Sequence, residues 1–254
     1  YIADIIPPNR WGEALGMHGL CFSIGGAIGP AIGSYIAAQY GMNPLFYSSS
    51  FFALMSILIV MNMKETLKVK AQFSVRMLNI DRSEIIEWRV IPAAIVTLLS
   101  YTGYGVILTL IPDWSDHLGI ANKGLFFTIY TISSIGIRFI SGKVADRYGR
   151  IRVMYVGTFV VALAILIIGL GDSINGLLLG AVIYGIGTGI LSPAVNAWTI
   201  DLSLPQHRGR AMATMYIALE VGIGFGALAA GYIYADNIAR IPGIFIINSL
   251  IIIL

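Results

Sequence analysis

Two ionisable residues stand inside long apolar stretches of the sequence, where a charge is costly and therefore suggests a function. Glu220 lies nine residues into one apolar stretch, which is about 14 Å at the rise of an α-helix. Its carboxyl group can exchange a proton or hold a cationic solute, or it can be a protonated or paired acid that only locks helices together. Arg138 lies four residues before Gly142, near the end of another stretch.

Aromatic residues near the middle of apolar stretches form a second set that could bind a solute. A buried tyrosine hydroxyl needs a hydrogen-bond partner, which a polar cavity can supply. We therefore interpret these residues as candidates for a cavity lining that suits amphiphilic or cationic organic solutes, although each can instead be a packing residue between helices. The candidates are Tyr101, Tyr104, Tyr130, Tyr184, Phe22, Phe127 and Asn196.

No set of residues in the sequence suits catalysis or metal binding. Cys21 is the single cysteine, and the three histidines, His18, His117 and His207, are scattered along the chain. We therefore expect no metal site. A nucleophile with an adjacent base is not found either, so we expect neither enzyme activity nor a cofactor.

The composition explains what kind of protein must position these residues. Of 254 residues, 57% are hydrophobic and only 11% are charged, where about 25% is usual for a soluble domain. Such a chain cannot cover a soluble surface with charges. The mean hydropathy of +0.82 excludes a soluble enzyme, a disordered chain and a coiled coil. The apolar stretches also lack the alternation of a β-barrel, so the sequence predicts an all-α, polytopic membrane helix bundle.

Eight apolar runs are candidates for membrane-spanning helices, each of which needs about 20 residues. Pro92, Pro193 and many glycines lie inside these runs, which membrane helices tolerate better than soluble ones. The last run is short, and we expect it to be cut. The runs are 14–38, 44–63, 90–112, 122–141, 153–170, 174–200, 211–235 and 241–254.

Positive charges lie mainly on one side of the predicted spans. The loops 1–13, 64–89, 142–152 and 201–210 hold 13 of the 16 lysines and arginines. The positive-inside rule places these loops in the cytoplasm, here of a bacterial-type inner (plasma) membrane. The net charge of +3 therefore reflects topology, and we expect no nucleic-acid partner. Loop 64–89 is predicted to be a solvated linker with a short helix at 81–88.

The beginning and the end of the sequence resemble each other at an offset of 197 residues. Both copies start from the cytoplasmic side, which is typical of transporters with parallel repeats. We expect about 107 residues with about four helices before Tyr1, and thus two halves of six helices. Residues 1–63 would end the first half, 64–89 link the halves, and 90–254 form the second half. The matched pairs include Asp4 with Asp201, Pro8 with Pro205, Gly12 with Gly209, Gly25 with Gly222 and Gly29 with Gly226.

Residues 142–152 combine glycines with charges. Gly142 and Gly149 allow a tight turn, and Asp146 can accept hydrogen bonds at a helix N-terminus. The pattern Gly142, Asp146, Arg147, Gly149, Arg150 resembles the G-x-x-x-D-R-x-G-R signature of the major facilitator superfamily, in the copy between helices eight and nine. The resemblance implies a cytoplasmic gate in which Asp146 contacts the start of helix five and which includes Arg138 and Asp201. The charges can also serve topology alone.

The first apolar run contains a second pattern. Gly16, Gly25, Gly29, Pro30 and Gly33 have the spacing G-x8-G-x3-G-P-x2-G, which resembles the helix-five signature of antiporters in this superfamily, with Ser34 in place of the final glycine. Glycines four residues apart form a flat stripe for close helix packing, and the proline can bend the helix. The resemblance places this stripe at the seam between the halves, opposite helix eight.

The sequence is thus identified as a member of the major facilitator superfamily with this fold, covering helices five to twelve and an incomplete N-terminal half. The resemblance implies a monomeric antiporter that works by alternating access and exports small organic or drug-like solutes in exchange for protons. Its partners would be a small-molecule substrate, protons and the lipid bilayer. A sugar or metabolite carrier and a non-transporting receptor or relic remain alternatives.

Overall fold

The computed structural model describes residues 11–63, 86–204 and 207–253, and in these ranges all regular secondary structure is helical, without strands. Each of the eight predicted apolar runs forms an α-helix, so the predicted all-α bundle is confirmed. The α-helices are α2 (Trp11–Tyr40), α3 (Met42–Met61), α5 (Ile91–His117), α6 (Leu125–Tyr148), α7 (Arg150–Leu170), α8 (Ile174–Leu202), α9 (Arg208–Tyr234) and α10 (Ile241–Ile253).

Among the described residues, five helical segments are long and apolar enough to cross a membrane. They comprise α3, α5 with the preceding 3-10 turn Trp88–Val90, α7, α8 and α9. Pro193 lies inside α8, as expected. Pro92 lies in the first turn of α5, where no backbone N–H is needed, so it does not interrupt that helix.

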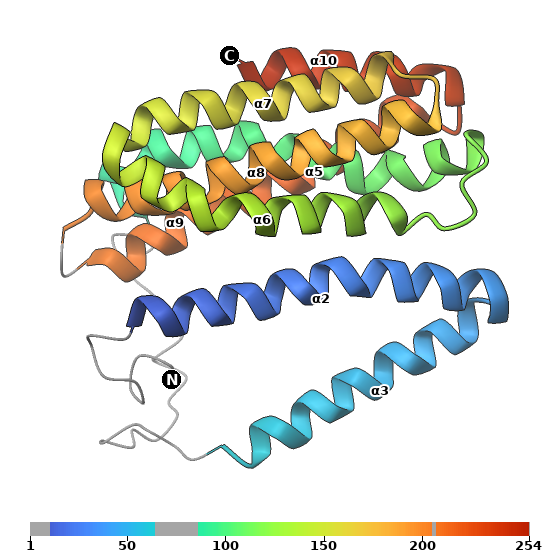
Figure 1. The fold of residues 1–254 in the computed structure, drawn as a ribbon, viewed down its shortest axis with the longest axis horizontal. Coiled ribbons are helices and arrows are strands. Elements are labelled where there is room, and N and C mark those ends of the chain that lie inside the picture. Colours follow the sequence, from blue (N-terminus) through green and yellow to red (C-terminus); the bar gives the residue numbers. More distant parts are fainter. Residues whose placement is uncertain (1–10, 64–85, 205–206, 254) are drawn as a thin grey trace.

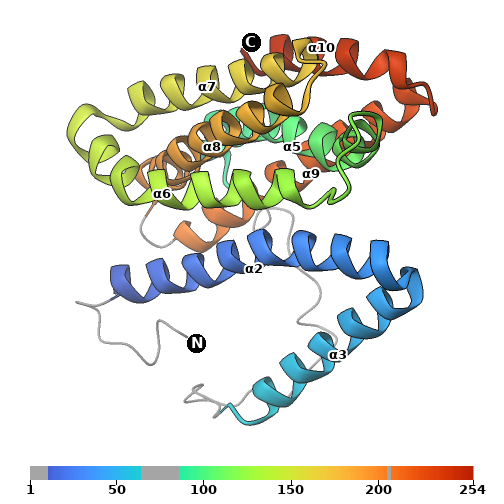
Figure 2. The same ribbon diagram turned by 45° about the vertical axis from the view of Figure 1, so that its right-hand side comes forward.

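The six helices from α5 to α10 form one bundle, shown in the upper part of Figure 1. α5 packs along α9, α8 lies between α6 and α7, and α10 packs on α7 and α5. α2 runs along α6, whereas α3 contacts α2 and diverges from the bundle, as Figures 1 and 2 both show. No described residue of α3 is buried.

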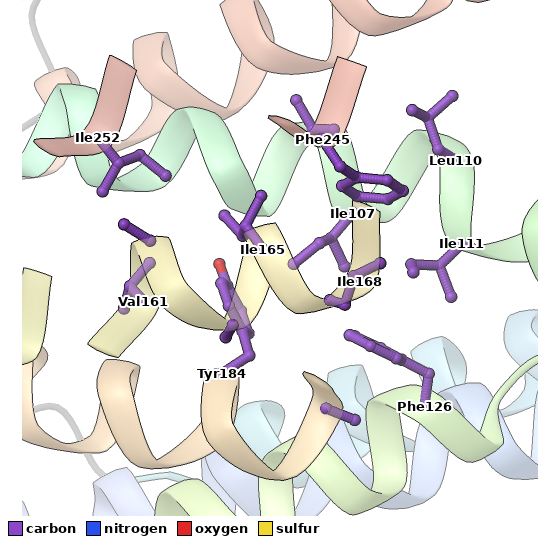
Figure 3. Close-up of a cluster of buried hydrophobic side chains, with 14 of the residues drawn as sticks. Ile107, Leu110, Ile111, Phe126, Val161, Ile165, Ile168, Tyr184, Phe245 and Ile252 are labelled. Atoms are coloured by element: carbon purple, nitrogen blue, oxygen red, sulfur yellow. The ribbon is translucent and has the colours of Figure 1, made fainter. Parts of the chain in front are cut away.

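The hydrophobic core lies between α5, α7, α8 and α10. Ile107, Ile165, Ile168 and Phe245 have no exposed surface, and their side chains meet in Figure 3. Tyr184 of α8 enters the same cluster. Burial of each such aliphatic side chain contributes about 1.5–3 kcal/mol, so the bundle has a continuous apolar interior that holds these four helices together.

The region 142–152 is more helical than the predicted loop. α6 continues to Tyr148 and α7 begins at Arg150, so Gly142 lies within a helix and does not form a turn. Gly149 alone joins the two helices, with φ of +93°, a conformation that glycine adopts without a steric penalty. The charged residues therefore extend both helices beyond their apolar parts. Of the predicted helix at 81–88, residues 81–85 lie outside the described ranges and Trp88 begins a 3-10 turn.

Candidate functional site

Three of the predicted tyrosines form one aromatic cluster. Tyr130 of α6 lies between Tyr104 of α5 and Tyr184 of α8, with ring centroids 6.1 Å and 5.4 Å away. The side chain of Tyr130 forms a hydrogen bond with Thr188, one turn beyond Tyr184 on α8. Aromatic pairs at this spacing and tilt attract one another. The structure therefore brings together residues that are up to 80 positions apart in the sequence.

Tyr101 extends this aromatic cluster toward α8 and α9. Its side chain forms a hydrogen bond with Ser192 of α8. A cavity of about 40 Å³ borders both residues and is also lined by Thr97, Asn196 and Tyr216. The predicted Asn196 thus lies beside the cluster. Thr188, Ser192 and Tyr216 were missed, although Tyr216 stands one helical turn before Glu220 and could have been found by that spacing.

Arg138 lies near two of the tyrosines. Its guanidinium group is close enough to Tyr101 and Tyr130 to interact with both electrostatically. Asp201, its expected partner, is instead joined to Arg150, with 3.2 Å between Nε and Oδ2. The grouping of Arg138 with Asp146 and Asp201 stays a prediction, because the side chain of Asp146 lies outside the described part. Arg138 itself stands two helical turns after Tyr130 on α6.

Glu220 lies in the middle of α9, as predicted from its depth, but its side chain is exposed in the described structure. The opposite face of α9, with Ala218 and Gly222, is buried. Because Tyr216 precedes Glu220 by one turn, both lie on the side of α9 that borders Tyr101. The described residues therefore leave the Glu220 side chain exposed, one helical turn after Tyr216, which lines the cavity at Tyr101.

The side chains around the loop signature are described only in part. The Arg150–Asp201 ion pair joins the start of α7 to the end of α8. The guanidinium carbon of Arg147 lies 5.6 Å from the ring centre of Tyr148.

The side chains of Asp146 and Phe22, and the surroundings of Gly16 and Gly142, lie outside the described part. Phe127 is buried against Phe126, which favours a packing role.

A comparison with protein families decides the identity of this bundle. The family model of the Major Facilitator Superfamily matches residues 1–91 and 93–254. The chain belongs to the major facilitator superfamily. It is therefore a multi-pass membrane protein, and its family consists of transporters and not enzymes.

Similar proteins include bacterial drug pumps. A multi-drug resistance efflux pump of Streptococcus pneumoniae is 27% identical over 238 residues, which cover 90% of this chain and 59% of the pump. Multidrug resistance protein 2 of Bacillus subtilis is 27% identical over 149 residues, 58% of this chain and 37% of that protein. An MFS-type transporter of Methanocaldococcus jannaschii is 26% identical over 92% of this chain and 62% of its own length. The chain thus spans less than two thirds of these relatives.

The helix-five pattern of this major facilitator chain lies on α2, which packs on α6 as the pairing of helices five and eight requires. The closest approach is at Gly124, where an added Cβ would overlap the backbone of Pro30 and Ala31. A Cβ added to Gly25 or Gly29 would meet no described atom within 4 Å. One described point of close contact between α2 and α6 is therefore at Pro30 and Ala31, and the role of the glycine stripe stays a prediction.

A polar cluster at the start of α9 was not predicted. Glu87, the last linker residue before the turn into α5, is only 5% exposed. Its Oε2 lies 2.8 Å from Nη2 of Arg210 and 3.1 Å from Nδ1 of His207, and its N–H donates to Oγ1 of Thr214 at 2.9 Å. The hydrogen bond from Arg210 lowers the pKa of the Glu87 carboxyl group. The end of the linker is thus anchored, contrary to the solvated linker that was predicted.

Proposed function

We propose that the complete protein is a secondary transporter that exports small organic or drug-like solutes in exchange for protons. The observation that carries this proposal is the cluster of Tyr101, Tyr104, Tyr130 and Tyr184, which α5, α6 and α8 bring together near the middle of the bundle. A relative named as a multi-drug resistance efflux pump and another named as a multidrug resistance protein support the same class of solute.

The chemistry of this cluster favours amphiphilic solutes. Tyrosine rings present apolar faces to a solute, while their hydroxyl groups and Ser192 offer hydrogen bonds. In alternating access, two helical halves rock around a site near the middle of the membrane. The helices that carry the tyrosines all belong to the proposed second half, 90–254. The proposed first half would supply the opposite wall of the site from 1–63 and further helices.

Proton coupling is assigned to Glu220. Its carboxyl group lies in the middle of α9 and is exposed, one helical turn after Tyr216, which lines the cavity at Tyr101. An acid in that place can bind a proton from one side of the membrane and release it to the other when the halves rock. The basic loops would lie in the cytoplasm of a bacterial-type inner membrane, and one copy of the chain would suffice.

The test is the exchange of Glu220 for glutamine in the full chain, reconstituted into vesicles with an imposed pH gradient and a fluorescent lipophilic cation as solute. We expect Glu220→Gln to abolish the dependence of efflux on the gradient. Asp172→Asn is the matched control, because Asp172 is an exposed acid outside the helices. This variant should transport like the unsubstituted protein. If Glu220→Gln leaves transport and its pH dependence intact, the assignment is wrong.

A sugar or metabolite carrier is the second candidate. The small cavity beside Tyr101 is lined by Thr97, Ser192 and Asn196, whose polar groups suit hydroxylated solutes. Uptake of a panel of sugars and amphiphilic cations into the same vesicles separates the two candidates. The absence of flux for all solutes by the full chain would favour a non-transporting receptor or relic.

A further inference from the structure

An apolar groove opens between α6 and α7, over α8. Its volume is about 380 Å³, and its lining includes Ile140 and Val144 of α6, Tyr148 between the helices, Arg152 and Val156 of α7, and Ile190 of α8. Ile140 is 58% exposed and Val156 is 56% exposed, so the groove is open to the outside of the bundle. It lies apart from the tyrosine cluster, with which it shares no lining residue.

The walls of the groove are almost free of polar groups. Ser141, the one hydroxyl-bearing residue of the lining besides Tyr148, donates its hydroxyl hydrogen bond to the Gly189 carbonyl at 2.9 Å. Apart from the Tyr148 hydroxyl group and the Arg152 guanidinium group, the lining therefore offers dispersion contacts and no hydrogen bonds to a guest. A polar solute would lose the hydrogen bonds of its hydration shell there and gain few in return. A hydrocarbon chain has no such hydrogen bonds to lose.

A cation stands at one end of the groove. Arg152 is exposed in the first turn of α7, where the apolar parts of α6 and α7 give way to the charged residues 143–152. Arg150 is paired with Asp201, and Arg147 lies over the ring of Tyr148. Among the side chains that the structure describes, Arg152 forms no ion pair, so its guanidinium group can bind an anion.

We propose that this groove binds one anionic phospholipid of the cytoplasmic leaflet, with an acyl chain along Ile140, Val144 and Val156 and the phosphate at Arg152. The positive charge of Arg152 at the end of the groove complements the anionic headgroup, and the apolar walls complement the acyl chain. Basic pockets between membrane helices on the cytoplasmic side bind acidic headgroups in this way. The proposal depends on the membrane orientation of the chain and not on which solute it transports.

The experiment compares lipids retained by the full chain after extraction from nanodiscs that contain equal amounts of phosphatidylglycerol and phosphatidylcholine, counted by native mass spectrometry. We expect preferential retention of phosphatidylglycerol. Arg152→Gln should weaken that retention about fivefold, the effect of one basic residue near a membrane surface. Val156→Trp should weaken it similarly by filling the groove, and excess inorganic phosphate should not displace the lipid.

Two matched variants control for general effects of charge and bulk. Arg208→Gln removes another exposed arginine outside the groove, and Leu170→Trp adds bulk to a 69% exposed position at the far end of α7. Both should retain phosphatidylglycerol like the parent. Equal retention of the two lipids by the parent, parental retention by both Arg152→Gln and Val156→Trp, or displacement by phosphate would each overturn the proposal.

Discussion

The hairpin of α2 and α3 and the hairpin of α9 and α10 are two copies of one repeat with different surroundings. Each has a long helix that ends near residues with positive φ, Gly41 in the first copy and Ala235 and Asp236 in the second. α9 and α10 are built into the bundle, whereas α3 contributes no buried residue. The same local sequence thus produces the same helices, but a partner must be present before a face is buried.

The glycines of the repeat show this difference residue by residue. A Cβ added to Gly222 would overlap the carbonyl oxygen of Leu98, and one added to Gly226 would overlap that of Thr102. Their repeat partners, Gly25 and Gly29, have open space among the described atoms. The small-residue stripe of α9 therefore lets the α5 backbone approach closely. The repeat predicts that a helix equivalent to α5 occupies the stripe of α2 in the complete protein.

The largest expected effect on stability is the difference between a leucine placed in the stripe of α9 and one placed in the stripe of α2. Gly226→Leu should destabilise the bundle by about 3 kcal/mol, because the backbone of α5 cannot move away without disrupting the core. Gly29→Leu in the 254-residue chain should stay within about 0.5 kcal/mol, because no described atom opposes it. Thermal unfolding in detergent measures both. Equal losses would contradict the comparison, and a large loss for Gly29→Leu only in a longer chain would show that a further helix packs on the stripe of α2.

A second difference lies at the starts of α9 and α2. Arg210, in the first turn of α9, forms hydrogen bonds with the buried Glu87. The position of α2 that matches Arg210 in the repeat is Glu13. Because the pKa of Glu87 is lowered below its ordinary value of 4.5, its charged form stabilises the folded state above that pH. This stabilisation should be lost as the pH falls through the lowered pKa.

Unfolding curves at neutral and acidic pH test this anchor. Glu87→Gln should lower the Tm at neutral pH by several degrees, because the charged contact with Arg210 is lost, and the difference from the unsubstituted protein should shrink in acid. A Tm difference that stays constant with pH would show that packing, and not charge, holds the linker.

The smallest effect is expected at Asp201, the repeat partner of Asp4. Its ion pair with Arg150 is partly solvated, with side-chain exposures of 54% and 27%, and such pairs contribute about 0–1 kcal/mol. Asp201→Asn should therefore change the free energy of unfolding by less than about 1 kcal/mol. A loss of stability as large as that of Gly226→Leu would show that Asp201, and not the glycines, anchors this copy of the repeat.

Much of the fold could be predicted because hydropathy and length identify a membrane helix locally. All eight apolar runs form helices, but their ends were misplaced around Gly149, since charged residues can continue a helix beyond its apolar part. The tyrosines were predicted to line one cavity only because each lies near the middle of its apolar run. The gate role of Arg138 stays a prediction, because closeness to the loop signature in the sequence does not give the direction of its side chain on α6.

The amino-acid sequence alone determined the class of the protein, the eight apolar helices of the described ranges and the repeat that relates α2 to α9, because apolar length, charge asymmetry and residue spacing are local properties. Only the tertiary structure decided that Glu87 meets Arg210 across 123 positions, that Asp201 pairs with Arg150, and that one glycine stripe is buried while its copy is open. These outcomes depend on which helices become neighbours, and packing between distant segments is a property of the whole bundle.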